Sequence, residues 1–133
     1  MNHVVDLTAE LAKLKTLEGR TPASSEAERK EAIARLAPYR TGAVFASKFA
    51  GTGAWERHPQ GDEIVQIVEG STILHLMTSK GRQSLSLGAG TMVIVPRDMW
   101  HQFEAPVGVS LITVTPQPTE HLREDIAEPP MAG

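Results

Sequence analysis

The feature that most constrains this chain is a change of pattern near residue 42. From there to residue 115, short β-rich runs alternate with turn signals such as GTG, PQGD, SKGR and GAG. The expected strands cover residues 44–49, 54–58, 63–68, 72–78, 83–87, 91–95, 100–104 and 109–115. Short strands at such regular spacing are typical of a sandwich or a closed barrel rather than of a fold that alternates strands and helices. The sequence therefore predicts an all-β domain.

The N-terminal part has a helical pattern instead. Asp6 is placed to cap a first helix that Gly19 ends, and Ser25 with Glu28 forms a capping box for a second helix that stops at Pro38. The apolar residues at helical spacing are Leu7, Leu11, Leu14 and Leu17 in the first helix, and Ala32, Ile33 and Leu36 in the second. Neither apolar face is wide enough to stand alone, so both helices should pack on something else.

These patterns divide the chain into three parts. Residues 1–41 form a helical segment that packs on the β domain, residues 42–115 form that domain, and residues 116–133 form a proline-rich tail. The tail is expected to wrap over the surface or to be loose.

Composition narrows the possible partners. The formal charge is −3, with 13 basic and 16 acidic side chains and no long block of one sign, so nucleic acid is not an expected partner. No apolar run approaches the length of a membrane span, and the first residues lack the pattern of a secretory signal. Cysteine is absent, which leaves histidines and carboxylates as the strong metal ligands. We therefore expect a cytoplasmic protein that does not contact a membrane.

Several potential ligands gather in a small part of the sequence. Glu56 and His58 are two residues apart on one expected strand, so their side chains point to the same face. After the PQGD turn, Glu63 opens the next antiparallel strand, where facing Cβ atoms lie roughly 5 Å apart. His101 comes from a later strand, which must lie beside these two if the sheet closes. Two imidazoles with one or two carboxylates suit Fe, Mn, Ni, Co or Zn, whereas Ca and Mg favour oxygen ligands only.

Two segments of the β domain resemble the paired sequence motifs of the cupin superfamily. The first motif, G followed by HxH, three or four residues, E, six residues and G, corresponds here to Glu56-x-His58-x4-Glu63-x6-Gly70, with Gly51 or Gly53 upstream. The second, G-x5-P-x-G-x2-H-x3-N, corresponds to Gly90-x5-Pro96-x-Asp98-x2-His101-x3-Ala105. The resemblance implies a small antiparallel, jelly-roll-like β-barrel, usually dimeric, with a metal in the mouth of the barrel.

Three positions depart from the family pattern. Glu56 stands where the first histidine of the motif would be, Asp98 replaces a turn glycine, and Ala105 replaces the final asparagine. Asp is one of the few non-glycine residues that accept a left-handed backbone, so the second change is tolerable. Two carboxylates would neutralise a divalent ion and make it less Lewis-acidic. An alternative alignment takes His58 and Gln60 as the HxH pair, but it shortens the following loop too far.

Strand alternation also predicts which residues line the cavity of the barrel. Those that share a face with the candidate ligands are Val65 and Ile67 on one strand, and Met99 and Phe103 around His101. A mainly apolar cavity beside a metal suits a small, partly hydrophobic ligand. Trp55 and Trp100 have the opposite parity and should face outward, under the N-terminal helices or a second subunit.

The remaining histidines are expected outside the site. If Glu69 and Gly70 form a two-residue turn, His75 points outward, whereas a one-residue bulge would turn it into the cavity. We take the outward orientation as the default. His3 and His121 lie outside the barrel strands and are expected on the surface.

Three functions remain open on the sequence. The first is a small-molecule metalloenzyme of oxygenase, isomerase or lyase type, with Glu56 as a ligand or a general base. The second is a non-catalytic module that binds or senses a small ligand, and the third is a metal-free barrel. The chain has no serine-nucleophile elbow and no phosphate-binding glycine loop, so catalysis would depend on the ion. We also expect a homodimer, because the apolar N-terminal residues need a partner.

Overall fold

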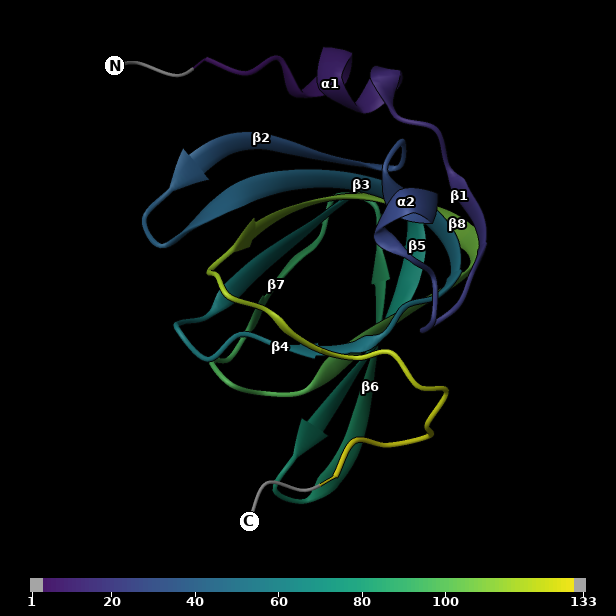
Figure 1. Cartoon of the computed structure of the whole chain (residues 1–133), viewed down its shortest axis with the longest axis vertical. Helices are drawn as coiled ribbons and strands as arrows, with labels where there is room; N and C mark the ends of the chain where they lie inside the picture. The colour runs from purple at the N-terminus through teal and green to yellow at the C-terminus, as the bar shows by residue number, and fades with distance from the viewer. Residues whose placement is uncertain (1–3, 131–133) are drawn as a thin grey trace.

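The structure, a computed structural model, describes residues 4–130 and consists mainly of β-strands that curl into a barrel-like sheet (Figure 1). The helices are α1 (Leu7–Lys13) and α2 (Glu26–Arg29). The strands are β1 (Leu17–Arg20), β2 (Ile33–Tyr39), β3 (Gly42–Thr52), β4 (Trp55–Arg57), β5 (Glu63–Thr78), β6 (Gly81–Gly88), β7 (Met92–Val95), β8 (His101–Thr115) and β9 (Glu120–Leu122). The all-β prediction is confirmed. No helix within residues 4–130 is long and apolar enough to cross a membrane.

Two long strands organise the sheet. β8 pairs antiparallel with β3, β4 and β5, while β5 also pairs antiparallel with β6 and β7. Each long strand therefore contributes to two parts of the barrel wall. The start of β5 and the start of β8, where Glu63 and His101 lie, are both brought to the region around the short strand β4.

The sequence predicted a break in each of these long strands, and both breaks are absent. The expected turn at Gly70 is a bulge within β5, with a register shift against β8. Gly70 has a φ of 74° and Gly108 on β8 a φ of 97°, and a Cβ on Gly70 would overlap the carbonyl oxygen of Gly108. Because the two glycines let the backbones approach so closely, the paired strands bend together instead of ending.

The N-terminal part contains more β structure than its helical pattern predicts. α1 ends at Lys13, and Leu17 already belongs to β1. The capping box of α2 is present, but this helix ends at Arg29 and the residues from Ile33 onward form β2. β1 and β2 pair with the edge of β3 that β8 leaves open, so backbone pairing at that edge outweighs a weak helical periodicity.

Two apolar clusters lie on opposite faces of the sheet. The inner cluster fills part of the barrel and includes Phe49, Val65, Ile67, Leu74, Leu76, Val95, Val109 and Leu111. The outer cluster forms where α1 lies over β3 (Figure 1), and it joins Leu11, Leu14 and Leu36 to Ala46 and Ile112. The apolar residues of the N-terminal helix therefore pack largely against the outer face of the chain's own sheet.

The C-terminal part wraps over the barrel. β9 pairs with β4, and the Trp55 indole N–H donates a hydrogen bond of 3.3 Å to the carbonyl of Ile126. Trp55 faces away from the barrel interior, as predicted, but the chain's own C-terminal part buries it completely, rather than the N-terminal helices. Trp100 is almost buried and carries the guanidinium of Arg57 on its ring.

Candidate metal centre

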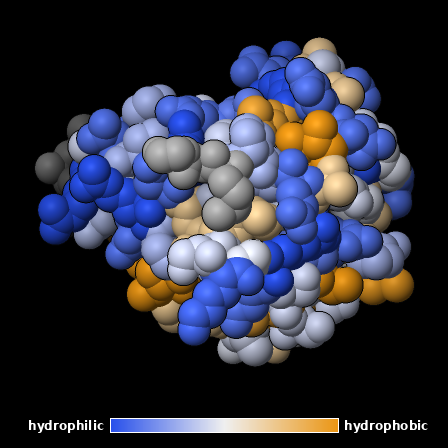
Figure 2. Space-filling model, turned by 90° about the horizontal axis from the view of Figure 1, so that it is seen from below, coloured by the Kyte–Doolittle hydropathy of each residue, from blue (hydrophilic) through white to orange (hydrophobic). Residues whose placement is uncertain are grey.

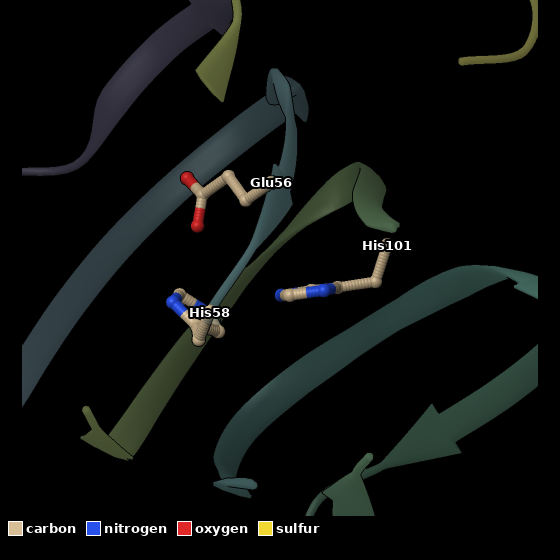
Figure 3. A group of neighbouring side chains, drawn as sticks. All are labelled: Glu56, His58 and His101. Carbon is tan, nitrogen blue, oxygen red and sulfur yellow. The ribbon is translucent and has the colours of Figure 1, made fainter. Parts of the chain in front are cut away.

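The centre is built around Glu56, the middle residue of β4. Glu56 pairs with His101 on β8 at one side and with His121 on β9 at the other. Residues directly opposite in adjacent strands share a face of the sheet, so these three side chains lie on the same side. His58 follows β4, and its ring turns toward His101, as Figure 3 shows, with 5.1 Å between the ring centroids.

Two turns hold His58 in this position. Asp98 adopts the left-handed backbone expected for it, with a φ of 64°, and its N–H donates a 3.0 Å hydrogen bond to the carbonyl of His58. In the same region the backbone N–H of Arg97 donates to Oδ1 of Asp62 at 2.7 Å. These bonds join the loop after β4 to the turn before β8, so they bring the first and second motif together.

The four predicted ligands converge. Glu56, His58 and His101 each offer one ligand atom, and these atoms lie within 4.8 Å of one another (Figure 3). Glu63 lies against both histidines, with 3.3 Å from Oε2 to His58 Nε2 and 3.2 Å from Oε1 to His101 Nε2. His58, Glu63 and His101 are each at most 4% exposed. The site is thus a compact group of two imidazoles and two carboxylates, three of them buried and Glu56 partly exposed.

A second set of contacts orients these side chains. The Nδ1–H of His101 donates to the Met99 carbonyl at 3.0 Å, which leaves Nε2 facing the centre. His58 Nδ1 is 2.9 Å from the Thr119 hydroxyl, and Glu63 Oε2 accepts a 2.6 Å hydrogen bond from the Thr115 hydroxyl. Histidines that ligate metals commonly bond through their other ring nitrogen in this way, because the bond fixes the tautomer and the ring orientation.

The donor atoms themselves fit a metal ion. Nε2 of His58, Nε2 of His101 and Oε1 of Glu63 are buried and have no hydrogen-bond partner among the described residues. The two histidine nitrogens lie 3.3 and 3.2 Å from the oxygens of the Glu63 carboxylate. Buried polar atoms without partners are costly, and a divalent cation would satisfy all three at once. The mixed nitrogen and oxygen donor set suits a first-row transition metal or zinc.

The centre holds its carboxylates in the ionised form. Burial alone raises the pKa of Glu63, but the adjacent His101 and His58 outweigh it and lower this pKa to about 2. Burial likewise opposes ionisation of Glu56, and the hydrogen bond and charge of His121 together with the charge of His101 lower its pKa to about 2. For His101, burial lowers the pKa, but Glu63 overcomes this and raises it. Ionised carboxylates are the form that ligates a cation.

A cavity of about 510 Å³ opens beside the centre, and both Glu56 and Glu63 line it. Its walls include Phe45 and Phe49 from β3, and Leu111 and Thr113 from β8. This volume is within the usual range for small-molecule sites. A cavity with these carboxylates and apolar side chains in its walls can hold a small molecule next to the centre.

Of the four residues predicted to line the cavity, only Phe103 does so. Val65 and Ile67 point inward, but they are at most 1% exposed and belong to the packed inner cluster, and Met99 packs against that cluster. Alternation along a strand predicts the inner face correctly, but it cannot tell the filled part of the barrel from the open part.

Two residues of the C-terminal part belong to the site, although the sequence placed them on the surface or in the tail. His121 lies 3.5 Å from Glu56 through Nε2, and Thr119 contacts His58. Residues 119–122 (TEHL) carry no apolar alternation that would predict a strand, and the proline-rich tail was expected to wrap over the surface or to be loose. His3 lies outside the described residues.

His75 lies on the outer face of the barrel, since Leu74 and Leu76 on either side belong to the inner cluster. This agrees with the default orientation, but it arises with two register shifts inside β5 rather than with the turn on which that expectation was based. Even so it is only 5% exposed, because Glu104 and Ser84 contact its ring nitrogens at 2.9 and 2.8 Å and Trp55 lies beside it.

Comparison with known proteins gives a clear answer on the fold. No family model matches the chain, and no curated protein matches it. Among solved structures, a cupin-2 domain containing protein from Shewanella frigidimarina aligns with a TM-score of 0.64 and 17% identity, over 86% of this chain and 95% of the other. A protein from Neisseria meningitidis aligns with a TM-score of 0.62 and 22% identity, over 86% of this chain and all of the other.

A cupin-like protein from Thermotoga maritima is similar over 68% of this chain and 74% of its own, with a TM-score of 0.57 and 22% identity. Hydroquinone 1,2-dioxygenase from a Sphingomonas species is similar over 61% of this chain and 62% of its own, with a TM-score of 0.53 and 16% identity. At such identities the likeness concerns the fold. Together with the curled, mainly antiparallel sheet, it shows that this chain has the fold of a cupin β-barrel, as its two motifs predicted.

Proposed function

We propose that this protein is a metal-dependent enzyme that acts on a small molecule, with Glu56, His58, Glu63 and His101 holding one divalent ion. The observation that supports this most directly is the group of three buried donor atoms without hydrogen-bond partners among the described residues, on His58, Glu63 and His101. Each of these atoms would lose its desolvation cost on binding a cation. The convergence of Glu56 on the same point supplies a fourth donor.

The donor set favours Fe, Mn, Ni, Co or Zn. When bound, such an ion supplies Lewis acidity or, for the redox-active metals, electron transfer to a substrate held beside it. Glu56, His58, Glu63 and His101 would hold the ion beside the cavity that Glu56 and Glu63 line, where a small ligand could reach it. A reaction of oxygenase, isomerase or lyase type is consistent with this arrangement.

Glu56 serves in this proposal as a ligand rather than as a general base. A general base works best when its pKa lies near the working pH. The histidines around Glu56 hold its pKa at about 2, so the carboxylate is always ionised and only weakly basic at neutral pH. That property favours cation binding over proton abstraction.

Elemental analysis of protein purified without a metal-affinity tag tests the proposal. We expect about one transition-metal or zinc ion per chain in the wild-type protein. His101→Ala and Glu63→Ala should each lose most of it, because each removes one of few strong ligands. Turnover of any substrate found for the protein should fall with the metal content.

His75→Gln is the matched control, since His75 is equally buried but lies on the outer face of the barrel. This variant should keep its metal. A metal-free wild-type protein that also fails to take up Fe, Mn, Ni, Co or Zn after dialysis would overturn the proposal, as would equal metal contents in the His101→Ala and His75→Gln variants.

A further inference from the structure

The cavity beside the centre has a second chemical feature, a group of arginines that the metal centre does not use. Arg20 at the end of β1, Arg29 at the end of α2 and Arg123 after β9 all line it. They come from three different segments of the chain, of which Figure 1 shows β1 at the edge of the barrel and α2 in front of it. Three guanidinium groups from separate elements therefore meet around one cavity.

The arginines lack the partners that such groups normally have. No carboxylate of the described residues lies within ion-pair distance of any of the three, although Arg57 elsewhere contacts Asp98 and Glu120. The Nε–H groups of Arg20 and Arg29 are buried and donate to no partner among residues 4–130. Within the described part of the chain, Arg123 donates one long bond, 3.3 Å from Nη1 to the Ser24 carbonyl. Buried donors without acceptors are costly unless a ligand completes them.

The fold makes room for Arg20 in particular. Its guanidinium lies 4.3 Å from the centroid of the Phe49 ring. A Cβ on Gly53 would lie 2.9 to 3.2 Å from the guanidinium atoms, so a glycine there allows the close approach. Burial lowers the pKa of Arg20, the charge of Glu56 opposes this, and the charges of Arg29 and Arg123 lower it further. The arginines thus repel one another, which an anion between them would relieve.

The charged residues around the cavity also favour an anionic ligand. A divalent ion at the centre balances the charges of Glu56 and Glu63. Of the remaining charged residues that line the cavity, Glu26 is the one carboxylate among the described residues, against Lys48 and the three arginines. The walls between these groups are largely apolar, with Phe45, Phe49 and Leu111 among them.

We propose that this cavity binds a small organic carboxylate, whose acid group is held by Arg20, Arg29 and Arg123 while its apolar body reaches toward the metal centre. Guanidinium groups match a carboxylate through paired N–H donors, and the apolar walls match a hydrocarbon or aromatic body. This inference rests on the proposed function for the role of the metal, but the arginine contacts can be tested separately. It assigns the substrate to the class of apolar monocarboxylic acids.

Isothermal titration calorimetry tests the proposal by measuring the affinity of the protein, as isolated, for 3-phenylpropionate. The neutral 3-phenylpropionamide has the same shape and serves as the reference ligand, and phenyl phosphate tests the other common anion. We expect the carboxylate to bind at least about tenfold more tightly than the amide. Arg29→Gln and Arg123→Gln should each weaken carboxylate binding about tenfold and leave amide binding unchanged.

Arg40→Gln is the matched control, because Arg40 is exposed and does not line the cavity. It should bind the carboxylate like the wild type. Equal binding of carboxylate and amide, no binding of the carboxylate, or wild-type affinity in both cavity variants would overturn the inference. Tighter binding of phenyl phosphate with the same arginine dependence would reject the carboxylate in favour of a phosphate.

Metal content measured on the same preparations separates the two proposals. Loss of carboxylate binding in Arg29→Gln at an unchanged metal content supports the arginine site itself. A protein without metal that still binds the carboxylate through the arginines would refute the metal-dependent function and uphold the carboxylate site. A metal-loaded protein that binds the amide and the carboxylate equally well would refute the carboxylate site and leave the metal-dependent function standing.

Discussion

Glu56 has histidines on both neighbouring strands, His101 on β8 and His121 on β9. The related motif of cupins has a histidine at its position, so this chain holds an extra negative charge at the centre. His121 lies near enough to hold that carboxylate ionised. Glu56 therefore has a histidine close to its carboxylate on each neighbouring strand, which makes a glutamate at this position physically reasonable.

Substitution of Glu56 should show whether it is a ligand. Glu56→Leu removes a donor and should lower metal affinity at least about tenfold, whereas Glu56→His supplies an imidazole and should still bind metal. Titration of the metal-free variants against a competing chelator measures both affinities. Wild-type affinity in Glu56→Leu would show that Glu56 is not a ligand.

Thr119 offers a second test at the residue scale, because its hydroxyl contacts the outer nitrogen of His58 at 2.9 Å. Thr119→Val keeps the shape but removes the hydrogen bond, so His58 loses its orientation and metal affinity should fall about 10–100-fold. Thr91→Val is the control, since the Thr91 hydroxyl bonds Gly88 in an exposed turn. The same chelator titration applies, and equal affinities in the two variants would contradict the role assigned to Thr119.

Among the elements, the paired bulge of β5 and β8 shapes the barrel. Gly70→Ala would put a side chain at a φ of 74° and against the Gly108 carbonyl, so it should lower the free energy of unfolding by about 2 kcal/mol or more. Gly61→Ala should change it little, because the nearest atoms to a Cβ there are 3.7 Å away. Urea unfolding measures both, and similar midpoints would contradict the close approach described for Gly70.

The elements also show how far the sequence alone could lead. The inner strands were predictable because period-two alternation and turn glycines act locally. The bulge at Gly70 was not, because a turn and a bulge use the same residue and the choice depends on Gly108, far along the chain. β2 was taken for a helix because its pairing with β3 is a tertiary contact that overrides local propensity.

The same difference between local pattern and tertiary contact applies to the site. His58, Glu63 and His101 could be predicted, since their spacing within two motifs carries the information. His121 and the arginines of the cavity could not, because they come from segments outside those motifs. His121 reaches the site through the pairing of β9 with β4, and Arg20 through the pairing of β1 with β3. The cavity walls differed from the prediction because alternation does not say which part of a barrel is filled.

At the scale of the whole molecule, the homodimer stays a prediction. Leu11, Leu14 and Leu36 pack within the chain, but Leu7 and Ile33 remain 42% and 38% exposed. On the face seen in Figure 2 most residues are hydrophilic, and the hydrophobic ones form separate patches. An interface through the N-terminal part would cover the apolar residues that remain exposed there.

Light scattering at micromolar concentration should give about twice the chain mass of 14.4 kDa. Leu7→Lys with Ile33→Lys should shift the protein toward the monomer, because two buried charges would oppose association. Met92→Lys is the control, since Met92 is 56% exposed on β7. A wild-type monomer would reject the dimer, and dissociation by Met92→Lys alone would move the interface away from the N-terminal part.

The central claim is that one ion binds among Glu56, His58, Glu63 and His101, and anomalous diffraction from metal-loaded crystals tests it most directly. The account predicts a single strong anomalous peak at the edge of the cavity, with His58 Nε2, His101 Nε2 and an oxygen of each carboxylate about 2.0–2.2 Å away for a zinc-like ion. A fully loaded crystal with its peak elsewhere, or with His58 or His101 turned away from the ion, would contradict it.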